Sequence, residues 1–196
     1  MVHHTDYREM VRANVENVIY ISSQSKGWFC YMSSSSVNLQ VQTPYSRTKR
    51  AAEEILQALP ELKSCIVRPY SVTGVGEQKE HLIPTLIRSC IEGEEMPFDP
   101  YPVHDFIDVE DVVDALVEFG EHGHTGIFEL GNGIPYTNQA VKEIVEEVTG
   151  KKAVVRDCGR IRKYDSSAWY CQKPSIKGKK TLIQSIQEMV SAYERA

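Results

Sequence analysis

Short apolar runs alternate with amphipathic helical patterns along the chain, and this alternation constrains the fold more than any other feature. Residues 18–21 (Val-Ile-Tyr-Ile) are β-branched and aromatic and precede Ser22 and Ser23, which predicts a buried strand ending at two hydroxyl groups. Residues 64–68 predict a second buried strand, which Pro69 stops. Apolar positions at helical spacing predict helices over residues 45–59, 83–92, 108–119, 137–149 and 181–194. Fully apolar strands separated by helices are typical of an α/β protein with a parallel sheet.

The pattern changes after Gly74, where proline and glycine become more frequent and the elements shorter. Three shorter strands are predicted in this part, over residues 105–107, 126–130 and 152–156. Asp108 and Thr137 have the side chains that cap helix N-termini, and Gly150 is suited to end a helix. We therefore expect a sheet-and-helix body over residues 1–74. Over residues 75–196 we expect the remainder of the sheet woven with a smaller lobe.

Charge and cysteine usage limit the function classes. The 196 residues carry a formal net charge of −5, so there is no basic excess to bind nucleic acid or an anionic membrane. The polar beginning of the chain lacks the apolar region of a targeting signal, and its aliphatic runs are too short to span a membrane. The five cysteines are scattered and include no Cys-x-x-Cys pair, which argues against a disulfide scaffold and predicts a reducing, cytoplasmic location.

Tyr45 and Lys49 are the first candidates for chemistry. Residues four apart share one face of a helix, and a lysine ammonium beside a phenol favours the tyrosinate and lowers the pKa of the tyrosine. Tyr45 then becomes usable as a general acid and base near neutral pH. The alternative is a surface tyrosine that packs on the aliphatic stem of a lysine.

The order of the motifs carries more information than any one of them. Hydroxyl side chains end a predicted strand at Ser22-Ser23, the Tyr45–Lys49 pair opens the next helix, and Arg68-Pro69-Tyr70-Ser71-Val72 ends the next strand. In this order the chain resembles the extended short-chain dehydrogenase/reductase family, the NAD-dependent epimerase/dehydratases of nucleotide sugars. The segments that carry the resemblance are residues 14–23, 44–53, 67–74, 104–111 and 130–133.

The resemblance implies a fold, a cofactor and a reaction. The fold is the C-terminal portion of a Rossmann-like parallel sheet with a small α/β substrate lobe, and the cofactor is NAD or NADP. Tyr45 would act as acid and base on the substrate hydroxyl, and Lys49 would bind the nicotinamide ribose. Ser23, with Ser22 as the alternative, would hydrogen-bond the reacting oxygen or contact the cofactor. The backbone of Pro69, Tyr70, Ser71 and Val72 would face the nicotinamide.

The resemblance also implies substrate contacts. His81, His104 and Arg162 lie where the family contacts the diphosphate of a nucleotide sugar. Histidine offers less to a diphosphate than a bidentate arginine, so the substrate is either bound weakly or is a small molecule that is not a nucleotide sugar. The alternatives are a turn histidine at His104 and a solvated loop charge at Arg162.

One departure from the family refines the expected activity. The dehydratases of the family carry an Asp-Glu pair after the site hydroxyl, whereas Gln24 and Ser25 follow Ser23 in this chain, which favours an epimerase or a simple reductase. A further set of carboxylates resembles a metal cluster, but helix capping accounts for the pattern and no metal site is expected. This set comprises Asp105, Asp108, Glu110 and Asp111.

The sequence contains no Gly-x-x-Gly-x-x-Gly turn, the element that seats the NAD pyrophosphate in the family. One expectation is an enzyme whose cofactor-binding half comes from another chain or lies outside this sequence. The other is a non-catalytic fragment or interaction subunit that keeps the site residues. A homodimer through the Tyr45–Lys49 helix is also possible within the family.

Overall fold

The computed structural model describes residues 6–25, 27–59, 61–159 and 170–195. Its largest sheet has four parallel strands in the order β1-β2-β6-β9. They are β1 (Trp28–Met32), β2 (Lys63–Pro69), β6 (Gly126–Gly131) and β9 (Ile176–Lys177). Hydrogen-bonded register aligns Cys30 with Cys65 and Arg68 with Glu129. The prediction of an α/β fold with a parallel sheet is confirmed.

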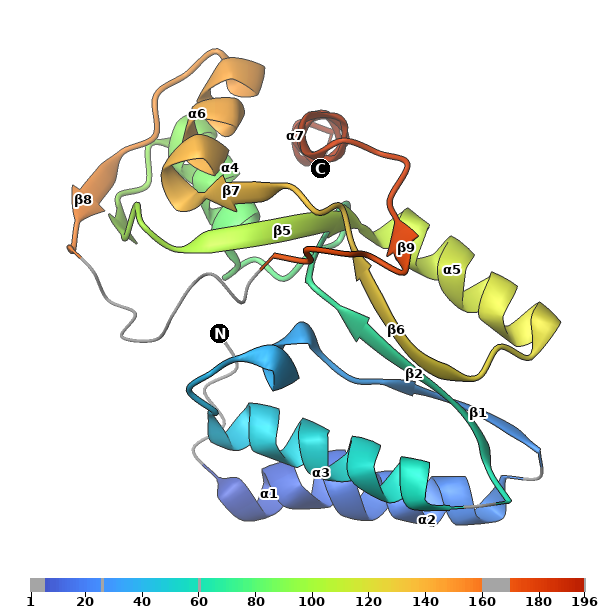
Figure 1. The fold of residues 1–196 in the computed structure, drawn as a ribbon. Coiled ribbons are helices and arrows are strands. Elements are labelled where there is room, and N and C mark those ends of the chain that lie inside the picture. The colour runs from blue at the N-terminus through green and yellow to red at the C-terminus, as the bar shows by residue number, and fades with distance from the viewer. Residues whose placement is uncertain (1–5, 26, 60, 160–169, 196) are drawn as a thin grey trace.

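One face of this sheet is covered by helices that precede and follow β1 (Figure 1). The first is α1 (Tyr7–Val11), which continues through a π-helical stretch (Arg12–Glu16) into α2 (Asn17–Gln24). The second is α3 (Pro44–Ala58), which begins at a capping box formed by Thr43 and Ser46. Tyr31, Ala52, Leu56 and Ile66 form the core between α3 and the sheet, and Val18 packs against it.

The prediction of a strand over residues 18–21 is wrong, because these residues lie within α2. Met10, Asn14, Val18 and Ser22 recur every fourth residue and form the less exposed face of the continuous helix, whereas Ile19, Tyr20 and Ile21 are exposed. Tertiary packing of the continuous helix over residues 7–24 therefore overrides the β-propensity of this apolar run. The strand that precedes α3 is β1, formed by residues 28–32 (Trp-Phe-Cys-Tyr-Met).

The opposite face of the sheet is covered by α5 (Val109–His122), which follows β5 (Val103–Asp108). As predicted, Asp108 caps α5, and its side chain accepts a hydrogen bond from the Glu110 N–H group. The core beneath α5 is continuous with the sheet and comprises Cys65, Val67, Ile107, Val112, Ala115, Phe119 and Leu130.

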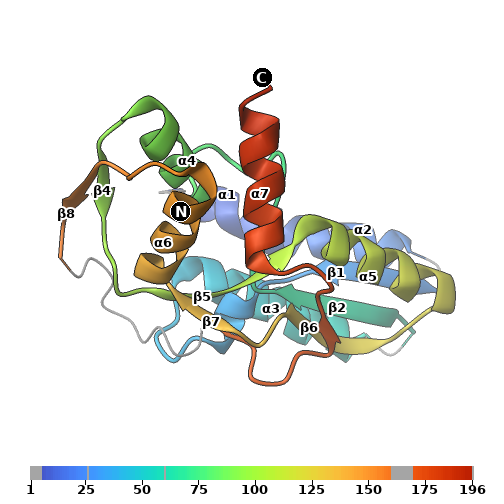
Figure 2. The ribbon, with the colours of Figure 1, turned by 90° about the horizontal axis from the view of Figure 1, so that it is seen from above.

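The remaining elements form a lobe beside the carboxyl ends of the main strands (Figures 1 and 2). The strands β3 (Ser71–Thr73), β5 and β7 (Pro135–Thr137) form one small sheet, and β4 (Met96–Phe98) pairs with β8 (Val155–Asp157). The helices are α4 (Leu82–Glu92), α6 (Asn138–Thr149) and α7 (Leu182–Tyr193). Their shared core includes Ile83, Leu86, Val141, Val145 and Ile186. The predicted caps at Thr137 and Gly150 are confirmed, while the strand predicted over residues 152–156 begins only at Val155.

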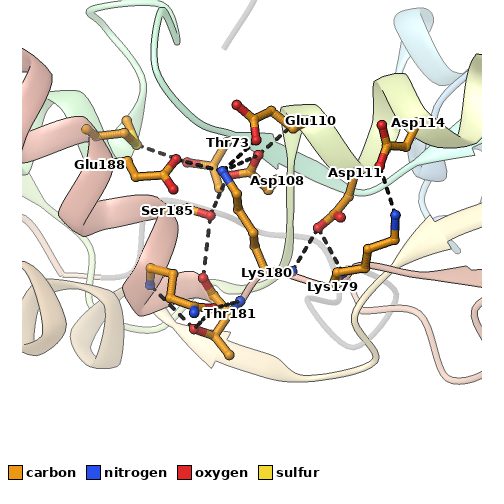
Figure 3. A network of polar contacts seen from close by, with 12 residues as sticks. Thr73, Asp108, Glu110, Asp111, Asp114, Lys179, Lys180, Thr181, Ser185 and Glu188 are labelled. Atoms are coloured by element: carbon orange, nitrogen blue, oxygen red, sulfur yellow. Dashed lines mark hydrogen bonds and ion pairs between the residues drawn. The ribbon is translucent and has the colours of Figure 1, made fainter.

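A polar network fastens α7 to the first turn of α5 (Figure 3). The Asp111 carboxylate accepts backbone hydrogen bonds from Lys179 and Lys180 at 2.9 and 3.0 Å. The Lys180 ammonium group lies 2.7 Å from carboxylate oxygens of both Glu110 and Glu188. These contacts fix the segment between β9 and α7 to the beginning of α5. Within the described ranges, no helix combines the length and apolar character needed to cross a membrane.

Candidate active site

Tyr45 and Lys49 lie in the first two turns of α3, beside the carboxyl end of β1. The Lys49 ammonium group donates a hydrogen bond to the carbonyl oxygen of Met32 at 3.0 Å. The same nitrogen lies 5.0 Å from the centre of the Tyr31 ring and 5.8 Å from that of Tyr45. The cation therefore sits at the end of a strand between two aromatic rings, which stabilise it through their π-systems.

Burial acts on both members of the pair. It raises the pKa of the Tyr45 phenol, and a side-chain hydrogen bond with Ser34 offsets part of this rise. Burial lowers the pKa of the Lys49 ammonium group, and the charge of Glu53 opposes that change. Burial thus disfavours the charged form of each group, and their neighbours restore part of it. The net direction for Tyr45 is upward, so the lowering of its pKa expected from the neighbouring Lys49 is not found in the chain by itself.

The hydroxyl group at the end of the strand belongs to Ser34, so the placement predicted for Ser23 and Ser22 is wrong. The Ser34 oxygen accepts a hydrogen bond from the Ser36 N–H group at 3.2 Å, in a 3₁₀ turn (Ser35–Asn38) that follows β1. Ser22 and Ser23 end α2, where their hydroxyls donate to the carbonyl oxygens of Ile19 and Tyr20. Because α2 leads into the start of β1, both serines lie near the amino ends of the strands, whereas Tyr45 lies near their carboxyl ends (Figure 1). The aromatic run before residues 33–36 was the signal for the correct serines.

The end of β2 is fixed by a group of charged side chains. Arg68 donates two hydrogen bonds to the carboxylate of Glu53, at 3.0 and 2.5 Å, and lies 3.4 Å from Glu129 on β6. The Tyr70 hydroxyl donates to Glu129 at 3.2 Å, and the Tyr70 N–H group bonds to the Leu130 carbonyl oxygen. Burial, followed by the charge of Glu129, raises the pKa of Tyr70. These contacts hold the backbone of residues 69–72 at the carboxyl edge of the sheet.

Two of the three candidate substrate contacts, His81 and His104, lie in the described part of the chain. His104 on β5 is buried, and its Nδ1 lies 3.0 Å from the hydroxyl oxygen of Ser71, which joins it to the turn after β2. His81 precedes α4, and its Nδ1 lies 3.1 Å from the carboxylate of Glu77. Arg162 lies outside the described residues.

The acidic residues of β5 and α5 serve as backbone acceptors. The buried Asp105 carboxylate accepts N–H groups from Asn132, Gly133 and Cys171 at 2.8, 2.8 and 3.0 Å. Burial raises the pKa of Asp105, while these backbone donors lower it. In the part of the chain that the structure describes, no group of three or more His, Cys, Asp or Glu side chains is arranged to hold a metal ion.

Comparison with known proteins gives relatives along most of the chain. It is 29% identical over 123 residues to the low-salt glycan biosynthesis protein Agl12 of Haloferax volcanii, an alignment that covers 58% of the chain and 39% of the relative. It is 25% identical over 211 residues to the GDP-6-deoxy-D-mannose reductase of Pseudomonas aeruginosa, which covers 86% of the chain and 66% of the relative. The chain therefore spans less than two thirds of the length of either curated relative.

Solved structures share the fold at low sequence identity. The dTDP-glucose 4,6-dehydratase of Bacillus anthracis in complex with NAD superposes with a TM-score of 0.83 and 21% identity, covering 96% of this chain and 68% of that one. RMD from Pseudomonas aeruginosa complexed with NADPH gives a TM-score of 0.79 and 18% identity, covering 96% and 76%. The family model for the NAD dependent epimerase/dehydratase family matches residues 7–131, which include β1, α3, β2 and the turn that follows. The chain belongs to the NAD dependent epimerase/dehydratase family.

Proposed function

We propose that this chain carries the acid–base machinery of an NAD(P)-dependent epimerase or reductase of a nucleotide sugar. The observation that carries the proposal is the grouping of Tyr45, Lys49 and Ser34 at the carboxyl end of β1. Ligands of open parallel sheets bind at this edge. A relative that is a GDP-6-deoxy-D-mannose reductase supports the substrate class.

The donor set fits the nicotinamide end of the cofactor. The Lys49 ammonium group and the Tyr45 hydroxyl are suited to hydrogen-bond the hydroxyls of a ribose, and the turn of residues 69–72 offers backbone to a flat ring. When bound, NAD(P) supplies the acceptor and donor of hydride. The pyrophosphate end lacks its glycine-rich turn within this sequence.

The residues of the chain would then move and hold a proton. Tyr45, as the tyrosinate, would take the proton of a sugar hydroxyl as the carbon beneath it is oxidised to a ketone, and would return it on reduction. Ser34 would donate a hydrogen bond to the same oxygen. Lys49 would favour the tyrosinate through its charge. His104, His81 and Arg162 are proposed to contact the diphosphate of the substrate.

Elimination of water is not part of the proposal. Ser35 and Ser36 follow Ser34, and neither offers a carboxylate to act on a neighbouring carbon of the sugar. The argument made for Gln24 and Ser25 applies instead to Ser35 and Ser36, and supports the same proposal. The activity that we propose is therefore that of an epimerase or a reductase.

The test is turnover of UDP-, GDP- and dTDP-hexoses with NAD or NADP, with product followed by chromatography. Tyr45→Phe is expected to abolish turnover while leaving cofactor affinity nearly intact, since it removes only the hydroxyl group. Tyr20→Phe, at a tyrosine that is 69% exposed on α2, is the matched control and should retain activity. Unchanged turnover in Tyr45→Phe would refute the role of Tyr45. Turnover of free sugars alone would point to a substrate without a nucleotide.

A second candidate is a subunit completed by another polypeptide. The observation that favours it is the edge of the main sheet, where β1 is paired with β2 but, among the described residues, with no strand on its other side. Val109, Val113 and Val117 also form an exposed apolar row on α5, over the same sheet. Exposed edges and apolar rows of this kind are sites of association. Calorimetry with NAD distinguishes the two: binding by the chain alone supports a self-sufficient site, and no binding favours a completing chain or a non-catalytic role.

A further inference from the structure

The carboxylate of Glu53 lies buried behind the Tyr45–Lys49 pair. Positions 45, 49 and 53 of α3 follow one another at intervals of four, so their side chains share one face of the helix. Glu53 is only 2% exposed, and both of its carboxylate oxygens accept hydrogen bonds from Arg68. A buried carboxylate is costly unless opposite charges compensate it, and Arg68 is the first such partner.

Arg68 does not balance this region alone, because it is shared. Its guanidinium group also lies 3.4 Å from Glu129, so one positive charge faces two carboxylates. The other described partners of the Glu129 carboxylate are neutral, namely the amide of Asn38 at 2.8 Å, the hydroxyl of Tyr70 at 3.2 Å and the thiol of Cys171 at 3.6 Å. The group therefore keeps an excess negative charge on the side of α3 where Lys49 lies. Lys49, one turn earlier on the same face of α3, brings a positive charge to this region, and the exposed Arg50, bonded to the carbonyl oxygen of Val37, brings another.

Among the described residues, the other groups recorded in contact with Lys49 are uncharged. Tyr31 of β1 and Tyr45 of α3 contribute aromatic rings, and Met32 contributes a carbonyl oxygen. Burial by itself drives Lys49 toward the neutral amine, and the charge of Glu53 opposes this. Glu53 is thus the ionised side chain that favours the ammonium form from within the same helix.

We propose that Glu53, held in place by Arg68, is a positioning residue that keeps Lys49 charged and directed at the end of β1. The inference rests on the proposed function, since the charge of Lys49 matters to catalysis through Tyr45. Glu53 lies one helical turn beyond Lys49, so the lysine and the carboxylate that acts on it belong to the same helix.

The test is an NMR titration of the Lys49 side chain, followed by its ¹⁵Nζ and ¹³Cε shifts in the full chain without cofactor. In Glu53→Gln the pKa of Lys49 is expected to fall by about one unit, the size of effect that a nearby opposite charge produces. Glu54→Gln is the matched control, because Glu54 is the next residue of α3 and is exposed. It should leave Lys49 unchanged. An unchanged Lys49 in folded Glu53→Gln would overturn the proposal.

A charge effect must also be separated from a packing effect. Glu53→Asp keeps the charge but shortens the side chain, so the pKa of Lys49 should stay near that of the unmodified protein. A fall as large as in Glu53→Gln would mean that shape acts and would overturn the proposal. If Glu53→Gln does not fold, Glu53→Met, a neutral side chain of similar length that leaves Arg68 in place, is measured instead, and the same fall is expected. The titration needs no turnover, so a failed activity assay leaves its result intact.

Discussion

The Lys49 ammonium group reaches the backbone of Met32, the last residue of β1, with a hydrogen bond of 3.0 Å to its carbonyl oxygen. The acceptor is a main-chain atom, so the contact does not depend on which side chain occupies position 32. It joins the second turn of α3 directly to the end of a strand. The contact therefore adds to the core between α3 and the sheet in holding the helix turn next to Tyr45 at the end of β1.

The identity of the site hydroxyl can be tested by comparing two serines. Ser34→Ala should raise the pKa of Tyr45, because it removes the side-chain hydrogen bond that lowers it. Ser23→Ala should leave the pKa of Tyr45 unchanged, because the Ser23 hydroxyl bonds to Tyr20 at the end of α2. The measurement is the ¹³Cζ shift of Tyr45 against pH. An effect of Ser23 instead of Ser34 would restore the placement expected from sequence.

Gly131 ends β6 where no side chain fits. A Cβ atom there would lie 2.6 Å from Oδ2 of Asp105 and 2.9 Å from Cβ of Cys171. Gly131→Ala should therefore lower the free energy of unfolding by about 1 to 3 kcal/mol, the usual cost of overpacking. Gly120→Ala is the matched control, since the nearest atom to its Cβ would be at 3.9 Å within α5. It should stabilise the protein by about 0.5 to 1 kcal/mol through helix propensity. Chemical denaturation measures both, and equal effects would contradict this account.

Asp105 should be hard to replace even by its amide. Asp105→Asn puts an NH₂ group where Oδ1 or Oδ2 now accepts backbone N–H groups from Asn132, Gly133 and Cys171. At least one buried donor then loses its acceptor, which costs about 1 to 3 kcal/mol of unfolding free energy. Asp114→Asn removes only an exposed pair with Lys179 and should change little. Thermal denaturation of the two variants measures the difference. If Asp105→Asn is as stable as the unmodified protein, other groups hold the segments that contain Asn132, Gly133 and Cys171.

Glu146 predicts a specific loss of stability in acid. Burial of this side chain opposes ionisation, but hydrogen bonds from Lys152, Lys142 and the Ala153 N–H group lower its pKa to about 2 from its ordinary value of 4.5. A carboxyl group that is more acidic when folded stabilises the protein above its unfolded pKa, and this contribution disappears as the pH falls from 4.5 to 2. We expect it to be on the order of 1 kcal/mol, because solvent screens the exposed Lys152.

The measurement is the unfolding free energy of Glu146→Gln against pH. Its deficit relative to the unmodified protein should be constant near neutral pH and should shrink below the ordinary range of a glutamate. Glu147→Gln, at the next and exposed position of α6, should show no such pH dependence. A deficit that persists unchanged at the lowest pH would mean that packing, rather than charge, is responsible.

Local sequence signals predicted several elements correctly. The caps at Asp108 and Thr137 and the stop at Gly150 depend on hydrogen bonds within a few residues, so the sequence contains all that is needed to place them. The strand over residues 64–68 was equally clear, because Pro69 ends it and both of its faces are covered. The family resemblance depended on these elements and on the α3 motif, and the match over residues 7–131 confirms it.

The prediction of the first strand failed because two apolar runs, residues 18–21 and 28–32, lie near the beginning of the chain. Residues 18–21 have the stronger β-propensity, yet they continue a helix whose other face packs on α3. The run at residues 28–32 follows closely in the sequence, and only tertiary packing shows which of the two runs is the strand. The error moved the site hydroxyl from Ser34 to Ser23. Glu53 was missed because its partner Arg68 is on another element, and only the fold brings them together.

The contacts of Asp105 also have a consequence for the order in which the protein is assembled. Its three backbone donors are separated from it by 27 to 66 positions along the chain. During synthesis, β5 is therefore complete long before the segment containing Cys171 has left the ribosome. Until then Oδ2 of Asp105 lacks one of its two backbone donors, so this end of the lobe closes only once residue 171 is available. Folding of this edge is a late, co-operative event, whereas the helix that carries Tyr45 and Lys49 can form while the chain is still growing.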